Sequence, residues 1–183
     1  GIIVTPVSTS QLVEVVAKSE GCRVIYTPVG SIYVARTMRG LIGRGDDVVF
    51  GGEGNGGLIF PEHQFCRDGG MTAAMMVFIL ASTGKKISAL TKALPERYII
   101  KDKINTPLGT QVLESLKKIY AQYPLELTDG IKIFQNSSWA LVRTSGTEPI
   151  IRVIVDSDTR KTAEIFHQEL MGTISKIITS QKP

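Results

Sequence analysis

Apolar residues in the first half of the chain fall in short runs whose spacing alternates between two patterns. Runs rich in valine and isoleucine predict strands at 2–4, 23–26, 48–50 and 58–60. Apolar positions at helical spacing predict helices at about 12–20, 31–42, 71–82 and 88–94. Strands that alternate with helices are typical of a parallel, three-layer α/β domain.

Several residues predict where helices begin and end. Ser8 with Gln11 forms a capping box before the first helix, and Gly21 suits its C-terminal cap. Ser31 is expected to cap the second helix. Thr106, which is followed by proline, predicts a helix start in the second half of the chain.

The helix predicted over 71–82 is apolar on nearly every side. A helix of this kind is typical of a buried position, and it is too short to span a bilayer. We therefore expect Met71, Met75 and Met76 to lie in a core.

The order of elements changes near Pro95. The following segments are predicted in the order β-α-β-β-β-α: 97–104, 107–120, 131–134, 139–142, 150–155 and 159–178. Consecutive strands without a helix between them indicate an α+β domain. We therefore expect two domains, residues 1–95 (α/β) and residues 96–183 (α+β).

Composition and charge narrow the class of protein. The chain has 183 residues, 43% hydrophobic and 21% charged, as in globular proteins. The formal net charge is +4, and lysines and arginines are scattered. This pattern suits a small anionic substrate and does not indicate nucleic acid. No signal peptide or membrane span is visible, so we expect a cytoplasmic protein without a membrane partner.

Cysteine and histidine positions indicate no metal site. Cys22 and Cys66 form no metal-binding pattern, so we expect two buried small side chains in a reducing compartment. His63 and His167 have no neighbouring ligands in the sequence. The chain opens at Gly1 directly before a strand, which predicts a fragment cut at a domain edge.

The first candidate loop is 51–57, with five glycines around Glu53 and Asn55. It follows a predicted strand, and the carboxyl ends of strands are where α/β domains bind ligands. A carboxylate and an amide suit vicinal sugar hydroxyls. Taken alone, the loop favours a tight turn with a solvated glutamate over a binding site, because glycine-rich loops are common.

The second candidate loop is 143–149, between two predicted strands. An arginine, two hydroxyls and a glycine form an anion cradle, because Arg143 offers a two-pronged contact to phosphate. Arg152 follows three residues after the loop. An ordinary hairpin loop with an exposed arginine is the alternative. Ser145 has no histidine nearby in the sequence, so no nucleophilic triad is indicated.

Together these loops resemble the α-D-phosphohexomutase family, the phosphomannomutases and phosphoglucomutases. Residues 143–149, Arg-Thr-Ser-Gly-Thr-Glu-Pro, match the family's phosphate-binding loop nearly letter for letter. Residues 52–57 resemble its sugar-binding loop, G-E-x-S-G-H, in an archaeal form. Thr-x-Val-Gly at 27–30 and Arg-Asp-Gly at 67–69 also fit the pattern.

The resemblance covers the whole chain and implies the third and fourth of the family's four domains. It implies sugar binding by Glu53, Asn55, Gly30, Arg67 and Asp68, and phosphate binding by Arg143, Ser145, Gly146, Thr147 and Arg152. The family's nucleophilic serine and its Mg²⁺ motif do not occur in this sequence, so the resemblance implies no catalytic residue and no metal ligand in this chain.

The activity that the resemblance implies is the interconversion of hexose 1-phosphate and hexose 6-phosphate, through a phosphoserine enzyme and a hexose 1,6-bisphosphate. The fragment alone is expected to be inactive, and its partners are a phosphorylated hexose and the missing N-terminal domains. Gly57 stands where bacterial relatives have histidine, and His63 is one candidate for that histidine's role in proton transfer. A non-catalytic phosphosugar- or anion-binding module is the alternative function.

Overall fold

The computed structural model describes residues 1–181, and contacts divide the chain into two compact units, Gly1–Pro95 and Glu96–Pro183. Within residues 1–181, no helix combines the length and the apolar character needed to cross a membrane.

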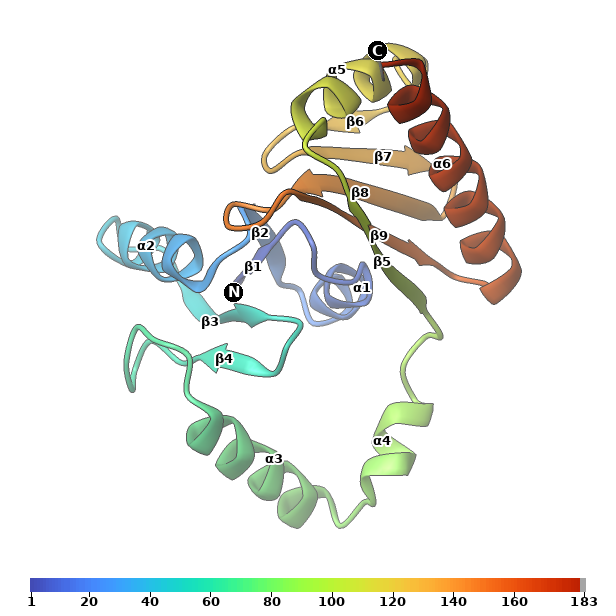
Figure 1. The fold of residues 1–183 in the computed structure, drawn as a ribbon. Coiled ribbons are helices and arrows are strands. Elements are labelled where there is room, and N and C mark those ends of the chain that lie inside the picture. Colours follow the sequence, from blue (N-terminus) through green and yellow to red (C-terminus); the bar gives the residue numbers. More distant parts are fainter. Residues whose placement is uncertain (182–183) are drawn as a thin grey trace. The chain divides into compact units, whose positions relative to one another are not determined.

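The first unit is built on a four-stranded sheet in the order β2-β1-β3-β4. Its elements in chain order are β1 (Ile2–Pro6), α1 (Leu12–Ser19), β2 (Arg23–Thr27), α2 (Ser31–Ile42), β3 (Val48–Glu53), β4 (Gly57–Ile59), α3 (Gly69–Thr83) and α4 (Ile87–Lys92) (Figure 1). Strands β1, β2 and β3 are parallel, and β4 returns antiparallel to β3. The two crossovers run in opposite directions across the sheet, so right-handed connections place α1 and α2 on opposite faces. The predicted three-layer α/β arrangement is confirmed.

The core of the first unit lies between the sheet and α2. It contains Ile2 and Val4 of β1, with Val34 and Met38 of α2, among other buried side chains. Because side chains alternate along a strand, Ile3 and Thr5 point to the opposite face. There they line a groove of about 290 Å³ together with Thr9, Val13, Phe50, Gly52, Glu53, Gly54, Gly56 and Leu58.

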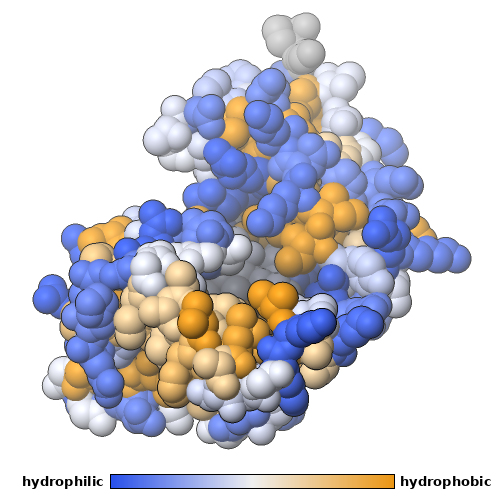
Figure 2. Space-filling view, turned by 90° about the horizontal axis from the view of Figure 1, so that it is seen from below, coloured by the Kyte–Doolittle hydropathy of each residue, from blue (hydrophilic) through white to orange (hydrophobic). Residues whose placement is uncertain are grey.

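Helix α3 is not buried, contrary to the prediction. None of its residues is buried, and Val77 and Phe78 are 64% and 63% exposed. Figure 2 shows the apolar surface on this side of the molecule. Met71, Met75 and Met76 are therefore not core residues. An all-apolar helix favours burial, but the sequence pattern does not supply the surface that covers it.

The second unit is a five-stranded antiparallel sheet in the order β5-β9-β8-β7-β6. Its elements are β5 (Tyr98–Asn105), α5 (Gly109–Ile119), β6 (Leu125–Glu126), β7 (Ile131–Gln135), β8 (Ser138–Thr144), β9 (Ile150–Ser157) and α6 (Arg160–Ser180). The core contains Leu116 of α5, Leu170 of α6 and Val142 of β8. The predicted α+β class is confirmed, with the two-residue strand β6 as an addition. So short a strand has no hydrophobic pattern of its own, since only its pairing to β7 defines it.

The predicted helix caps were partly wrong. No capping box forms at Ser8, because α1 begins later and Ser10 Oγ accepts the Leu12 N–H at 3.2 Å. Ser31 is the first residue of α2, and Gly30, at φ 137°, is its cap. These polar side chains bond to nearby backbone groups in several ways, so sequence alone does not fix the helix boundary.

The cap of helix α5 and the burial of the two cysteines also differ from the predictions. Thr106 does not cap α5, which begins at Gly109; its Oγ1 accepts the Leu108 N–H at 3.1 Å instead. Cys22 is half-buried and Cys66 is exposed, so the prediction of two buried cysteines was wrong. Gly21 has the positive φ of 66° that the predicted C-terminal cap requires.

Candidate functional site

The predicted sugar loop is a tight hairpin at the carboxyl end of β3. Strand β3 continues to Glu53 and β4 starts at Gly57, and these two residues pair directly across the hairpin. The turn is closed by Gly56 N–H donating to the Glu53 carbonyl at 3.2 Å, with Gly56 at φ 87°. Asn55 Oδ1 accepts the Gly57 N–H at 3.2 Å. The glycine-rich sequence therefore produces both a turn and a strand edge at the ligand-binding end of the sheet.

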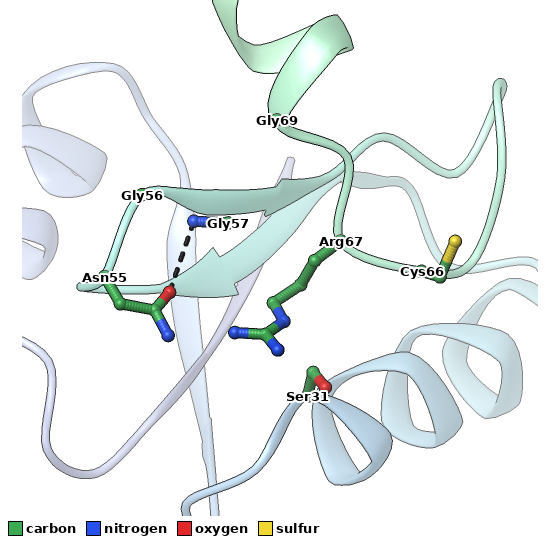
Figure 3. A pocket seen from close by; sticks show the side chains of 7 residues that line it. All are labelled: Ser31, Asn55, Gly56, Gly57, Cys66, Arg67 and Gly69. Atoms are coloured by element: carbon green, nitrogen blue, oxygen red, sulfur yellow. Dashed lines mark hydrogen bonds between the residues drawn. The ribbon is translucent and has the colours of Figure 1, made fainter.

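A cavity of about 570 Å³ lies against this hairpin. Its lining comes from the start of α2, the hairpin and the loop before α3 (Figure 3): Ser31, Asn55, Gly56, Gly57, Cys66, Arg67 and Gly69. Asn55 and Arg67 were predicted from the sequence, and the structure brings them together. Ser31 and Cys66 were not predicted here, because one was assigned as a helix cap and the other as a core residue.

Glu53 joins this cavity through an ion pair. Its carboxylate Oε2 lies 3.1 Å from Nη1 of Arg67, and the Glu53 side chain is only 12% exposed. The residue itself lines the neighbouring apolar groove. Gly30 caps α2 directly before Ser31, so the turn at 27–31 also reaches the cavity.

Asp68 is engaged in fixing the loop that carries Arg67. Its Oδ1 accepts the Met71 N–H at 2.8 Å and caps α3, while Oδ2 accepts from Gln64 Nε2 at 2.7 Å. Oδ2 also lies 3.1 Å from Nε2 of His63. The Met71 N–H, followed by His63, lowers the pKa of the Asp68 carboxyl below its usual value of 3.8. The sugar-binding role expected of Asp68 stays a prediction.

His63 is not among the residues that line the two cavities described above. Its side chain is 49% exposed and is paired with Asp68. The proton-transfer role considered for His63 therefore gains no support from its position. The other histidine, His167, pairs with Asp102 in the second unit at 3.1 Å.

In the second unit, the predicted phosphate loop connects β8 to β9. Arg143 is the penultimate residue of β8, with its side chain 17% exposed, and its Nε donates to Asp129 Oδ2 at 3.1 Å. Arg152 lies in β9, and its Nη2 donates to Glu148 Oε2 at 3.3 Å. Asp129 was not anticipated, because nothing in the sequence links it to a residue fourteen positions later.

The polar residues of this loop form a small turn of their own. Ser145 N–H donates to the Ile150 carbonyl at 2.9 Å, and Ser145 Oγ lies 3.4 Å from both the backbone N and Oγ1 of Thr147. Gly146 is exposed, and a side chain added there would meet nothing within 4 Å. The two hydroxyls are therefore grouped next to an open stretch of backbone, as an anion cradle requires.

Residues 1–181 contain no group of three or more histidine, cysteine, aspartate or glutamate side chains placed to hold a metal ion.

Two family sequence patterns match the chain. "Phosphoglucomutase/phosphomannomutase, alpha/beta/alpha domain III" matches residues 1–98, and "Phosphoglucomutase/phosphomannomutase, C-terminal domain" matches residues 99–172.

Relatives with curated names are also similar. A phosphoglucomutase/phosphomannomutase of Thermococcus kodakarensis is 40% identical, over 91% of this chain and 36% of the relative. A phosphoglucosamine/phosphogalactosamine mutase of Sulfurisphaera tokodaii is 36% identical, over 92% of this chain and 37% of the relative. A family protein from Burkholderia thailandensis shares the fold, with a TM-score of 0.79 at 18% identity, covering 96% of this chain and 37% of that one. The chain thus spans just over a third of the length of these proteins.

Proposed function

Because this chain belongs to the phosphoglucomutase/phosphomannomutase family, we propose that it supplies the sugar- and phosphate-binding part of a phosphohexomutase. Such an enzyme interconverts hexose 1-phosphate and hexose 6-phosphate through a phosphoserine and a hexose 1,6-bisphosphate. The nucleophilic serine and the Mg²⁺ ligands are assigned to other domains, since neither motif occurs in this sequence.

The observation that carries the proposal is the polar cavity at the carboxyl end of β3. Asn55 and Arg67 line it with an amide and a guanidinium, and this guanidinium is paired with the carboxylate of Glu53. Together they offer acceptors and donors for neighbouring sugar hydroxyls. The edge of the sheet where the parallel strands end is also where ligands bind in such domains.

The second unit is proposed to hold a phosphate group through Arg143, Ser145, Gly146, Thr147 and Arg152. A phosphate that does not react still contributes binding energy, which positions the reacting end of the sugar. In an enzyme that uses a bisphosphate intermediate, the sugar binds in two orientations. The same phosphate-binding site has to hold the phosphate that does not react in each of them.

A stand-alone phosphosugar-binding module is the competing function. The apolar surface of α3, where Val77 and Phe78 are more than 60% exposed, supports the enzyme-part proposal instead. Soluble domains that work alone rarely leave large apolar residues clustered on their surface.

The proposal is tested by titrating the labelled 183-residue chain with glucose 6-phosphate and recording amide chemical shifts. Shifts should cluster at residues 53–57 and 143–149, and free glucose should leave the second cluster unchanged. Shifts that are spread evenly over the chain, or that are the same with glucose, would overturn the proposed function.

A further inference from the structure

Gly57 leaves a space that another side chain fills. Glu53 and Gly57 are direct partners across the β3–β4 hairpin, so a side chain on residue 57 would emerge on the same face as that of Glu53. A Cβ added to Gly57 would lie 2.5 Å from Cδ of Arg67, 3.1 Å from its Cγ and 3.2 Å from its Cβ. Carbon atoms in contact prefer about 3.5–4.0 Å, so the stem of Arg67 already occupies this place.

From this position Arg67 reaches the carboxylate of Glu53. The contact between Nη1 and Oε2 is 3.1 Å, with Glu53 12% and Arg67 44% exposed. A guanidinium has five N–H donors in a fixed plane, and one ion pair leaves several of them unused. Figure 3 shows the guanidinium extending into the space between Asn55 and Ser31.

The backbone next to Arg67 is held against the sheet. The N–H of Asp68 donates to the Leu58 carbonyl of β4 at 3.0 Å, and the Asp68 side chain caps α3. Thr72 Oγ1 donates to the Asp68 carbonyl at 2.6 Å. The stem of Arg67 therefore starts from a fixed point and has a defined direction.

We propose that Arg67 is a positioning and specificity residue of the sugar site, and that Gly57 is the residue that makes room for it. Arg67 orients the Glu53 carboxylate and offers its remaining N–H groups to a hydroxyl oxygen of the hexose. This inference rests on the proposed function. It also accounts for glycine at position 57, where the G-E-x-S-G-H pattern has histidine, because a side chain at this position and the stem of Arg67 exclude each other.

The test uses the complete 183-residue chain and its affinity for glucose 6-phosphate, followed by the amide shifts of the hairpin. Arg67→Gln and Gly57→Ala should each weaken binding by about tenfold or more, as expected for losing a hydrogen bond to a charged group. The double variant should be no weaker than either single variant, because Gly57→Ala acts by displacing Arg67. Arg67→Lys keeps the charge without the planar fork and should fall between wild type and Arg67→Gln.

Two control variants keep the comparison matched. Arg44→Gln removes a 68% exposed arginine from a surface pair with Asp46, and Gly172→Ala adds a methyl group that meets nothing within 4 Å. Both should bind as the wild type does. Melting temperatures of all variants separate a loss of affinity from a loss of fold.

The possible results separate a failure of this inference from a failure of the proposed function on which it rests. If the wild type binds and Arg67→Gln binds equally well, even with a lowered melting temperature, the inference is wrong and the proposed function stands. The same holds if the effects of the two single variants multiply in the double variant. If the amide chemical shifts of the wild-type hairpin do not change with glucose 6-phosphate, the proposed function and the inference are both wrong.

Discussion

Arg143 and Arg152 lie directly opposite each other on the adjacent antiparallel strands β8 and β9. Opposed residues point to the same face of a sheet, where like charges destabilise the pair. On the other side of β9, Lys103 of β5 is also the direct partner of Arg152. Carboxylates compensate both arginines, Asp129 for one and Glu148 for the other. The result is a row of three basic residues beside the loop proposed to bind phosphate.

Arg143→Lys should weaken glucose 6-phosphate binding by about tenfold or more, since an ammonium lacks the two-pronged contact that a guanidinium makes with phosphate. The shifts to follow are those of residues 143–149 in the 183-residue chain. Wild-type affinity should also fall with added salt, because screening weakens exposed charge pairs. An unchanged affinity in the variant would remove Arg143 from the phosphate site.

Lys103→Gln should change stability and binding in opposite directions. Removing one of three neighbouring cations relieves repulsion that amounts to a few tenths of a kcal/mol, about the size seen for like charges across strands. The melting temperature should therefore rise slightly at low salt and match the wild type at high salt, while phosphate affinity falls. If stability and affinity both decrease, Lys103 is not part of a repulsive row.

The ion pair between Arg97 and Asp156 should contribute far more to stability than a surface pair. Their side chains are only 9% and 0% exposed, and Arg97 Nη2 also donates to the Ser137 carbonyl at 3.1 Å. Asp156→Ala removes the buried carboxylate that faces this guanidinium and should cost about 3–5 kcal/mol.

Trp139, the single tryptophan, pairs with Asp156 across β8 and β9, so its fluorescence reports the unfolding of the second unit in denaturant. Glu148→Gln, at the exposed pair with Arg152 in the same unit, is the control and should cost less than about 1 kcal/mol. Equal effects of the two substitutions would contradict the structural role of the buried pair.

Lowering the pH should weaken the N-terminal cap of α3, because the carboxylate of Asp68 that forms this cap becomes protonated. The pKa of Asp68 is lowered in the folded chain, first by the Met71 N–H and then by His63. A lowered folded-state pKa stabilises the fold above the unfolded value of 3.8, and this stabilisation is lost as pH falls through the lower folded value. Asp68→Asn keeps a side-chain oxygen that can cap the helix, but this side chain does not titrate. The melting temperatures of both proteins are measured from about pH 5 to about pH 3 in steps of about one pH unit, and that of the variant should fall less than that of the wild type. Parallel curves for the two proteins would show that Asp68 does not carry this acid sensitivity.

The isolated chain should show no mutase activity on glucose 1-phosphate or mannose 1-phosphate with Mg²⁺. The sequence has no nucleophilic-serine motif, and residues 1–181 hold no acidic cluster for a metal. A coupled assay on rigorously purified chain, with a complete phosphohexomutase as positive control, measures this directly. Sustained turnover would show that the catalytic residues lie within these residues after all.

The hydrophobic spacing was enough to determine the strands and helices of both units and the change of class near Pro95, because periodicity depends on neighbours along the chain. It did not predict strand β6 or the exposure of α3. The first depends on pairing with β7, and the second depends on what covers the helix.

The sequence by itself also determined the two loops, since their residue types are adjacent along the chain and their chemistry is local. Only the tertiary structure decided which residues work with them. The register of the sheets pairs Arg143 with Arg152 and Glu53 with Gly57. A shift of the register by one residue would move every side chain of the shifted strand to the opposite face of the sheet. The packing of the loop before α3 then places Arg67 in the space that Gly57 leaves empty. These contacts join residues that are distant in sequence, and no local pattern encodes such distances.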